Sequence, residues 1–343
     1  MLVPLSLLCS ALVLLARDVA AAATKQSKRG LAYASDNTTD IRRANTTSSV
    51  VSWVYNWALN PPDYLASSGI EYIPMQWGAE GIENLAVTVK GLGAKTLLAF
   101  NEPDFAEQSN MNATFAAQLW MQYIEPLKAD GVRLGAPAVS SGGSGKPWLE
   151  EFMGACTKCT IDFIPIHWYG EGVGGFTDYL YQINGAYNKT IWVTEWAETS
   201  NNDSVVLDFL NATTTMLDSL EWVERYAWFG YFVRALRQID GAAGSNYLLD
   251  VNGDLNAAGQ VYVDAAKKVV SALPNPTGSA VIIPGNTAGG YTTVTPASDA
   301  AKTPAFATGT GSSAIRVDGP SSAIYTLLSV FIGLLAGAGM VFG

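Results

Sequence analysis

The sequence has very little of the chemistry with which proteins bind transition metals. Its 343 residues include one histidine, His167, and three cysteines. Zinc sites draw about three or four ligands from histidine, cysteine and carboxylate side chains. A single histidine therefore argues against a metal site built from several histidines.

The few cysteines allow only local cross-linking. Cys9 lies in an apolar N-terminal segment, while Cys156 and Cys159 are spaced C-x-x-C. In a thioredoxin-like context this spacing indicates redox chemistry, and with a second such pair it indicates zinc. The sequence shows neither context. We predict a structural disulfide between Cys156 and Cys159, with free thiols as the alternative.

Clustered positive charge is also missing. The net charge is −10, and basic residues gather only in the short stretch 25–29. A surface that binds phosphates needs clustered lysine and arginine, so nucleic acid is not an expected partner. Aromatic residues, by contrast, are abundant, with ten tryptophans. Aromatic faces are one way to bind the apolar faces of neutral sugars.

Both ends of the sequence resemble processing signals. Residues 1–23 combine an apolar stretch with a run of small residues, which is typical of a secretory signal peptide. Residues 321–343 are apolar and uncharged, and small residues lie about 8 to 12 positions upstream of the apolar tail, as in a glycosylphosphatidylinositol (GPI) attachment signal. We predict a secreted, cell-surface or wall protein anchored through Ser312, with a transmembrane tail as the alternative. Residues 274–320 are rich in Ser, Thr, Gly and Pro and predict a flexible stalk.

The extracellular prediction agrees with the density of glycosylation sequons. Six Asn-x-Ser/Thr acceptors begin at Asn37, Asn45, Asn112, Asn188, Asn202 and Asn211. A dibasic pair, Lys28 and Arg29, directly precedes the first expected strand. It predicts that residues 24–29 form a short linker or pro-segment ending in a processing site, with an ordinary exposed charge pair as the alternative.

The remaining residues, 30–273, are close to the roughly 250 residues typical of one (β/α)8 barrel. Helical stretches are expected at 84–91, 112–130 and 205–220, between short apolar segments. This alternation predicts a parallel sheet, and eight repeats predict its closure. An open doubly wound sheet is the alternative, but no G-x-G-x-x-G follows the first strand. The eight expected strands are 30–34, 50–55, 70–76, 96–100, 133–139, 163–167, 191–194 and 226–229.

Two of these apolar segments end on a glutamate. Glu102 follows the fourth expected strand in TLLAFNEPDF, and Glu195 follows the seventh in IWVTEWAE. The active site of a (β/α)8 barrel forms at the carboxyl ends of its strands, so both carboxylates are expected over one cavity. Two opposed carboxyl groups are what glycoside hydrolysis requires.

These residues carry a family resemblance. Asn101-Glu102-Pro103 and Thr194-Glu195-Trp196 resemble the acid/base and nucleophile signatures of a large clan of retaining (β/α)8 glycosidases. The order of motifs along the chain resembles that of glycoside hydrolase family 128, a group of β-1,3-glucanases common in fungi. These motifs are WVYNWALNPP, YIPMQWG, LLAFNEPD, IHWYG and WVTEWAE.

The resemblance covers residues 30–273 and implies endo-acting, retaining hydrolysis of β-1,3-glucan without metal or organic cofactor. It implies that Glu102 is the general acid/base and Glu195 the nucleophile. It further implies that Asn101 hydrogen-bonds the sugar 2-hydroxyl. We expect a monomer that contacts the membrane only through its anchor.

Other residues near the strand ends are candidates for substrate binding. Trp57, Trp77, Trp196 and Trp228 could present an indole face to a sugar, although core packing is the alternative for each. His167 and Tyr169 could hydrogen-bond the nucleophile or a sugar hydroxyl, with a structural histidine as the alternative. Asp104 and Glu198 are interpreted as orienting or surface groups.

Two further functions stay open. Transglycosylation would use the same residues with a sugar acceptor in place of water and would suit remodelling of a cell wall. A non-catalytic glucan-binding protein would have no need of both glutamates, and the presence of Glu102 and Glu195 argues against it.

Overall fold

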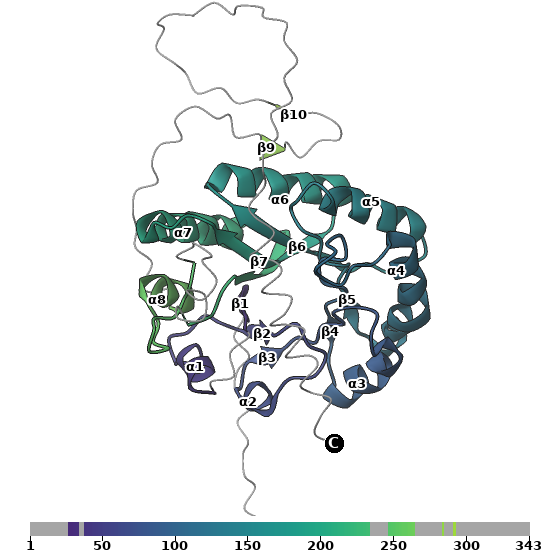
Figure 1. Ribbon diagram of the computed structural model, residues 1–343, viewed down its shortest axis with the longest axis horizontal. Coiled ribbons are helices and arrows are strands. Elements are labelled where there is room, and N and C mark those ends of the chain that lie inside the picture. Colours follow the sequence, from purple (N-terminus) through teal and green to yellow (C-terminus); the bar gives the residue numbers. More distant parts are fainter. Residues whose placement is uncertain (1–26, 34–37, 234–245, 265–282, 285–290, 293–343) are drawn as a thin grey trace, which may run out of the picture.

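The computed structural model describes residues 27–33, 38–233, 246–264, 283–284 and 291–292 (Figure 1). The predicted signal peptide, nearly all of the stalk, the anchor signal with Ser312 and the sequon at Asn37 lie outside these residues. Among the residues described, no helix is both long and apolar enough to cross a membrane.

Eight parallel strands form a barrel, as the sequence predicts. Six of them pair in the order β3-β2-β1-β8-β7-β6, and β4 pairs with β5. Isolated parallel bridges, Met75 to Leu98 and Gly135 to Phe163, join these two groups and close the ring. The strands are β1 (Arg29–Ala32), β2 (Trp53–Tyr55), β3 (Glu71–Tyr72), β4 (Thr96–Leu97), β5 (Arg133–Leu134), β6 (Phe163–Gly170), β7 (Thr190–Glu198) and β8 (Val223–Trp228).

Helices surround this ring of strands (Figure 1). The three helical stretches expected from the sequence are present, the second of them as consecutive α, π and 3-10 segments from Ala113 to Asp130. The α-helices are α1 (Thr38–Arg43), α2 (Asp63–Ala66), α3 (Leu85–Leu92), α4 (Ala113–Leu119), α5 (Gly145–Ala155), α6 (Val173–Tyr187), α7 (Asp203–Ser219) and α8 (Ala257–Val263). A separate antiparallel pair, β9 (Ile283–Pro284) and β10 (Tyr291–Thr292), lies beyond the barrel in sequence.

Aromatic side chains fill the inside of the barrel. The ring of Trp192 lies 5.3 Å from that of Trp53 and 4.2 Å from that of Phe163, centroid to centroid. A Cβ on Gly30 would stand 2.1 Å from the Trp53 indole, so only glycine leaves room for this ring in β1. The packed interior makes the barrel a rigid support for the side chains at its rim.

The prediction that Lys28 and Arg29 precede the folded domain is wrong. Arg29 begins β1, is 2% exposed, and donates to Tyr226, to Asp218 and to the carbonyls of Val261 and Tyr262. Lys28 donates to the carbonyl oxygens of Leu217, Asp218 and Leu220, where α7 ends. The pair therefore belongs to the barrel, and a protease could not reach Arg29 in the folded chain.

The disulfide predicted between Cys156 and Cys159 is confirmed, and it closes the turn that follows α5.

Four sequon asparagines, Asn45, Asn112, Asn188 and Asn202, are exposed. Asn211 is different, because it lies within α7 and both atoms of its side-chain amide are buried without a partner among the described residues. The hydroxyl of Thr213 in the same sequon is buried and bonded to the indole of Trp196.

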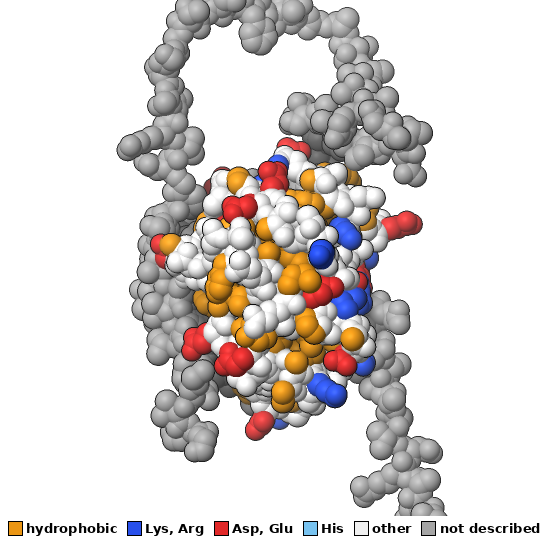
Figure 2. All heavy atoms as spheres, turned by 90° about the vertical axis from the view of Figure 1, so that its right-hand side faces the viewer, with side chains coloured by type: hydrophobic (Ala, Val, Ile, Leu, Met, Phe, Trp, Pro, Cys, Tyr) orange, Lys and Arg blue, Asp and Glu red, His pale blue; other side chains and the backbone are white. Residues whose placement is uncertain are grey.

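Figure 2 shows the face that carries α3, α4 and α5. Basic side chains stand singly there among acidic and apolar ones, so this face presents no continuous basic patch. Val87, Phe115 and Met121 are exposed apolar side chains of this region, at 77%, 45% and 42%. The surface is mixed in character and does not resemble a phosphate-binding face.

Candidate active site

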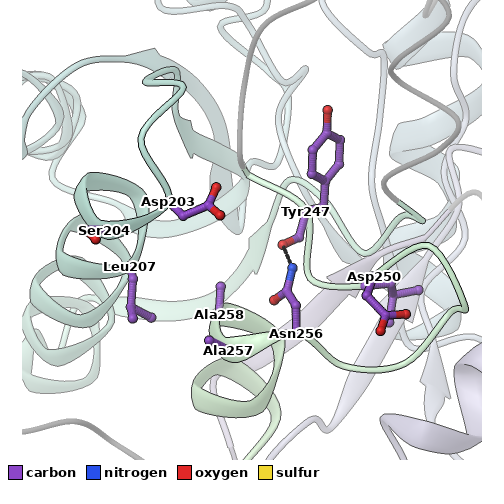
Figure 3. A pocket seen from close by; sticks show the side chains of 9 residues that line it. Asp203, Ser204, Leu207, Tyr247, Asp250, Asn256, Ala257 and Ala258 are labelled. Carbon is purple, nitrogen blue, oxygen red and sulfur yellow. Dashed lines mark hydrogen bonds between the residues drawn. The ribbon is translucent and has the colours of Figure 1, made fainter.

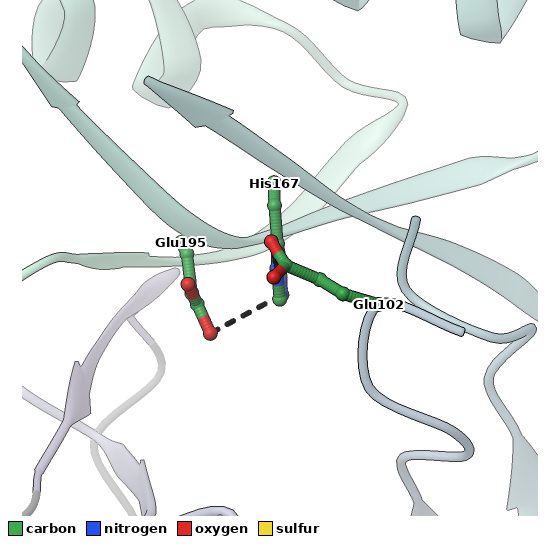
Figure 4. A group of neighbouring side chains, drawn as sticks. All are labelled: Glu102, His167 and Glu195. Carbon is green, nitrogen blue, oxygen red and sulfur yellow. Dashed lines mark hydrogen bonds and ion pairs between the residues drawn. The ribbon is translucent and has the colours of Figure 1, made fainter. Parts of the chain in front are cut away.

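Glu102 and Glu195 meet at the carboxyl ends of the strands, and His167 lies between them (Figure 4). His167 Nδ1 is 2.9 Å from Glu102 Oε1, and His167 Nε2 is 3.4 Å from Glu195 Oε1. The first contact is a hydrogen bond, whereas Nε2 forms an ion pair without hydrogen-bond geometry. One oxygen of each glutamate and a ring nitrogen of the histidine lie within 4.8 Å of one another.

The strands place these side chains as the barrel requires. Glu102 follows β4 at a positive φ of 40°, and its backbone N–H donates to the carbonyl of Ala138 at 2.7 Å. His167 and Glu195 are paired across neighbouring strands β6 and β7, just after a register shift between Ile166 and His167. Strand β7 continues to Glu198, so Glu195 lies within it. The sequence predicted a strand that ends at residue 194, just before Glu195.

Three aromatic side chains donate hydrogen bonds to the Glu195 carboxylate. Trp57 Nε1 is 2.7 Å and the Tyr55 hydroxyl 3.3 Å from Oε1, while the Tyr169 hydroxyl bonds to Oε2. Three donors from two strand ends fix the orientation of the Glu195 carboxylate.

Glu102 is as buried as Glu195, each at 3% exposed, but has a different set of hydrogen-bond donors. Burial raises the pKa of Glu102 to about 6, against the lowering effect of its hydrogen bond from His167. For His167, burial has the opposite sign and lowers the pKa. The charge of Glu195 and the hydrogen bond and charge of Glu102 outweigh burial, so the pKa of His167 lies above its ordinary value. A carboxyl group with a raised pKa is suited to general acid/base work near neutral pH.

These three residues also form the one group of potential metal ligands found among the described residues. However, the N–H of Trp57 and the O–H groups of Tyr55 and Tyr169 already point at Glu195. These donor hydrogens occupy the lone pairs that a cation would use, and they would face its positive charge. The surroundings therefore fit a hydrogen-bonded nucleophile better than a metal ligand.

Of the tryptophans predicted to bind substrate, Trp57 lies next to Glu195, and Trp77 packs against the aromatic cluster that contains Trp57. Trp57 contacts Glu195 directly and packs with Phe229 and Phe232. Trp77 is partly exposed, packs against the same cluster, and its indole N–H has no partner among the described residues. Trp57 is only 3% exposed and acts as a donor to Glu195, whereas Trp77 keeps an exposed part that a sugar could contact.

The prediction that Trp196 and Trp228 face the site is wrong. Both are fully buried, and their rings pack on each other at 5.1 Å. Trp196 donates to Thr213 of α7, and Trp228 donates to the carbonyl of Asn246. Consecutive strand residues point to opposite faces, so the residue after Glu195 turns outward into the layer between strands and helices.

Asn101, next to Glu102, is 2% exposed, and its amide nitrogen donates to Gln108 Oε1 at 3.1 Å. Its oxygen Oδ1 has no partner within the part of the chain that the structure describes. Glu198 is also buried and accepts from the backbone N–H groups of Gly172 and Ser200, which makes it an orienting residue of the neighbouring loops.

Sequence reasoning missed Tyr55, whose hydroxyl bonds to Glu195. Burial and the charge of Glu195 raise the pKa of Tyr55 well above its usual range, so the hydroxyl remains a donor. The sequence carries a signal for it, because Trp53, Tyr55 and Trp57 alternate along β2 and its end and share one face. Reading that alternation would have placed Tyr55 with Trp57.

A hollow of about 210 Å³ lies between the first turns of α7 and α8 (Figure 3). Asp203 and Asn256 stand on its two sides, and Asn256 donates to the carbonyl of Tyr247. Neither Glu102 nor Glu195 lines it. It is therefore separate from the carboxylate pair.

The chain is similar in sequence to known proteins. Residues 30–262 match the family model described as "Glycosyl hydrolase catalytic core". Alkali-sensitive linkage protein 1 of Schizosaccharomyces pombe is 35% identical over 246 residues, which are 69% of this chain and 44% of that protein. The chain thus spans less than half the length of this relative.

Solved structures are similar over the barrel. A curdlan-specific exo-β-1,3-glucanase of Blastomyces gilchristii, from glycoside hydrolase family 128, is 34% identical with a TM-score of 0.58, covering 70% of this chain and 98% of that one. An endo-β-1,3-glucanase variant of the same family from Amycolatopsis mediterranei, bound to laminaripentaose, is 34% identical with a TM-score of 0.57, covering 69% and 98%. A further family member from Aureobasidium namibiae, at 24% identity and a TM-score of 0.64, shows the shared fold.

Proposed function

Since the chain belongs to glycoside hydrolase family 128 and is a glycoside hydrolase, we propose that it is a retaining endo-β-1,3-glucanase acting on cell-wall glucan. The observation that carries the mechanism is the pair of buried glutamates at the strand ends, with carboxylate oxygens within 4.8 Å of one another. Retaining enzymes hold their carboxyl groups about 5 to 5.5 Å apart, whereas inverting enzymes leave about 6.5 to 9.5 Å for a water molecule.

The proposed reaction has two steps. Glu195 attacks the anomeric carbon and forms a glycosyl ester, while the bond to the leaving oxygen breaks and that oxygen takes the proton of Glu102. A water molecule then attacks the anomeric carbon, gives a proton to Glu102 and releases Glu195 as a carboxylate. His167 contacts both glutamates and holds them in register through this exchange.

The substrate is inferred from relatives and from the site. The Amycolatopsis enzyme was crystallised with laminari-oligosaccharides, which are β-1,3-glucan fragments. In this chain, the partly exposed Trp77 offers an indole for stacking on a pyranose ring, and Trp57 donates to Glu195. The extracellular location and the lipid anchor remain proposals from the sequence.

Product analysis on laminarihexaose tests the proposal. We expect shorter oligosaccharides from internal cleavage, with the β configuration retained in the first product as seen by proton NMR. Release of glucose alone from one end would refute endo action, and a first product of α configuration would refute retention. Longer products would identify a transglycosylase, and an unchanged substrate would identify a binding protein.

A further inference from the structure

Asp104, two residues after Glu102, connects two loops at the carboxyl end of the barrel. Its Oδ1 accepts from the backbone N–H of Ser140 at 3.1 Å, and its Oδ2 accepts from the hydroxyls of Ser140 at 2.6 Å and Ser144 at 2.9 Å. The proposed mechanism assigns no task to this carboxylate. Hydrogen bonds to an ionised acceptor are about twice as strong as neutral ones.

The loop that Asp104 belongs to is under local strain. Glu102 has a positive φ of 40°, a conformation that non-glycine residues rarely adopt. Its carbonyl accepts from the N–H of Phe105 at 3.0 Å, so Glu102 and Asp104 belong to the same tight turn. Such a backbone conformation persists only when surrounding contacts hold it.

The partner of Asp104 is itself firmly held. A Cβ on Gly145 would stand 1.9 Å from the carbonyl oxygen of Ser140, so α5 begins in close contact with this residue. The hydroxyl of Tyr179, on α6, donates to the same oxygen at 3.2 Å. Ser140 is 4% exposed and therefore provides a fixed point to which the turn of Glu102 is attached.

From this geometry we propose that Asp104 is a positioning residue, which holds the Glu102 side chain on the leaving oxygen by attaching its turn to Ser140 and Ser144. The inference rests on the proposed role of Glu102. A general acid must lie within hydrogen-bond reach of its target, and a small displacement of a reacting group costs a large part of the rate.

The charge of Asp104 also supports the role of Glu102 as an acid, because it raises the pKa of Glu102. Among the described residues, the ionisable groups that face Glu102 are Tyr55 from β2, His167 from β6, Tyr179 from α6, Glu195 from β7 and Asp104 from its own turn. After burial, which is the main cause, the negative charges of Glu195 and Asp104 both raise the pKa of Glu102. Removing the charge of Asp104 would lower that pKa and deprotonate the acid at a lower pH.

The test compares Asp104→Asn with a matched control, Glu125→Gln. Glu125 also accepts three hydrogen bonds, from Trp120 and from the backbone and hydroxyl of Thr160, but it lies near the amino ends of the strands. Each variant is assayed on laminarihexaose and on a dinitrophenyl β-laminaribioside, whose good leaving group needs no acid. Thermal melting reports folding, and Ser144→Ala removes one hydrogen bond without removing the charge.

We expect Asp104→Asn to lower kcat/KM on laminarihexaose about tenfold or more, a typical size for misplacing a general acid. Release of dinitrophenol in the first turnover should stay within about twofold of wild type, and the alkaline limb of the laminarihexaose profile should move to lower pH. Ser144→Ala should show a smaller rate loss on laminarihexaose with no pH displacement. Glu125→Gln should change neither the rate on laminarihexaose nor the position of the alkaline limb.

Equal losses on both substrates, or an unmoved alkaline limb, would overturn the proposal and leave Asp104 a structural residue only. The same is true if Glu125→Gln gives the same pattern. If Asp104→Asn does not fold, Ser144→Ala decides the question through the ratio of its rates on the two substrates. An inactive wild-type enzyme would instead refute the proposed function, so the two failures are distinguishable.

Discussion

The two glutamates are chemically alike and differ only in what surrounds them. Glu195 is held by hydrogen-bond donors from Trp57, Tyr55 and Tyr169, whereas Glu102 is buried beside a single imidazole. In the proposed mechanism Glu195 attacks the anomeric carbon and Glu102 donates the proton. Each role predicts a distinct defect when its side chain is removed.

With Glu102→Ala, an activated aryl β-laminaribioside should still form the ester, and added azide should release the β-glycosyl azide. With Glu195→Ala no ester can form, so azide should enter the vacated space and give the α-glycosyl azide. Proton NMR distinguishes the two anomers, and wild-type enzyme in azide is the control. Exchanged products would mean that the roles are reversed, and full activity in either variant would mean that this pair is not the catalytic site.

The raised pKa of Glu102 predicts the pH dependence of the reaction. Because the protonated form is the active acid, kcat/KM on laminarihexaose should fall as pH rises through about 6. The first turnover on an aryl glycoside with a good leaving group needs no acid and should lack this decline. A rate on laminarihexaose that stays constant up to pH 8 would contradict the assignment.

At the scale of single elements, β8 and the segment after β3 carry tryptophans in different environments. Trp228 is fully buried among Trp196 and Phe209, while Trp77 is partly exposed beside Trp57. We expect Trp228→Ala to lower the free energy of unfolding by about 3 to 5 kcal/mol, the usual range for a buried tryptophan. Urea denaturation followed by circular dichroism measures this.

Trp77→Ala is the matched variant at the rim. It should cost only about 1 kcal/mol of stability, because little packing is lost at a partly exposed position. Its kcat/KM on laminarihexaose should fall about tenfold, since the sugar loses a positioning contact. A stable Trp228→Ala variant with weakened substrate binding would restore the sequence-based interpretation of that residue.

Two helices form despite sequence patterns that disfavour them. α6 begins with Val173, Gly174 and Gly175, residues with poor helix propensity. It forms because Phe176, Leu180 and Ile183 are buried against the barrel. Tertiary packing thus outweighs propensity, as it does for α5 after the glycine-rich stretch at residues 141–145.

For the whole molecule, the sequence predicts a barrel attached to a surface by a lipid. Phosphatidylinositol-specific phospholipase should release the protein from membranes, since cleavage removes the lipid and leaves the barrel and stalk. Mass spectrometry of the mature protein should find its C-terminus near Ser312. A mature chain that retains residues 327–342 would rule out the lipid anchor.

The sequence by itself determined the barrel, its eight strands and the two glutamates, because apolar runs that end on a carboxylate are local features. It also determined the disulfide, since Cys156 and Cys159 are near neighbours in the chain. Even Tyr55 left a local signal in the alternation along β2.

The tertiary structure alone decided that Trp196 and Trp228 are fully buried against Thr213 and Phe209 of α7. It decided that Arg29 is a buried part of the barrel, because its partners Asp218 and Tyr226 lie nearly 190 residues or more away in sequence. It likewise joined Asp104 to Ser140 and His167 to both glutamates. Such contacts depend on how distant segments meet in space, which no local pattern encodes.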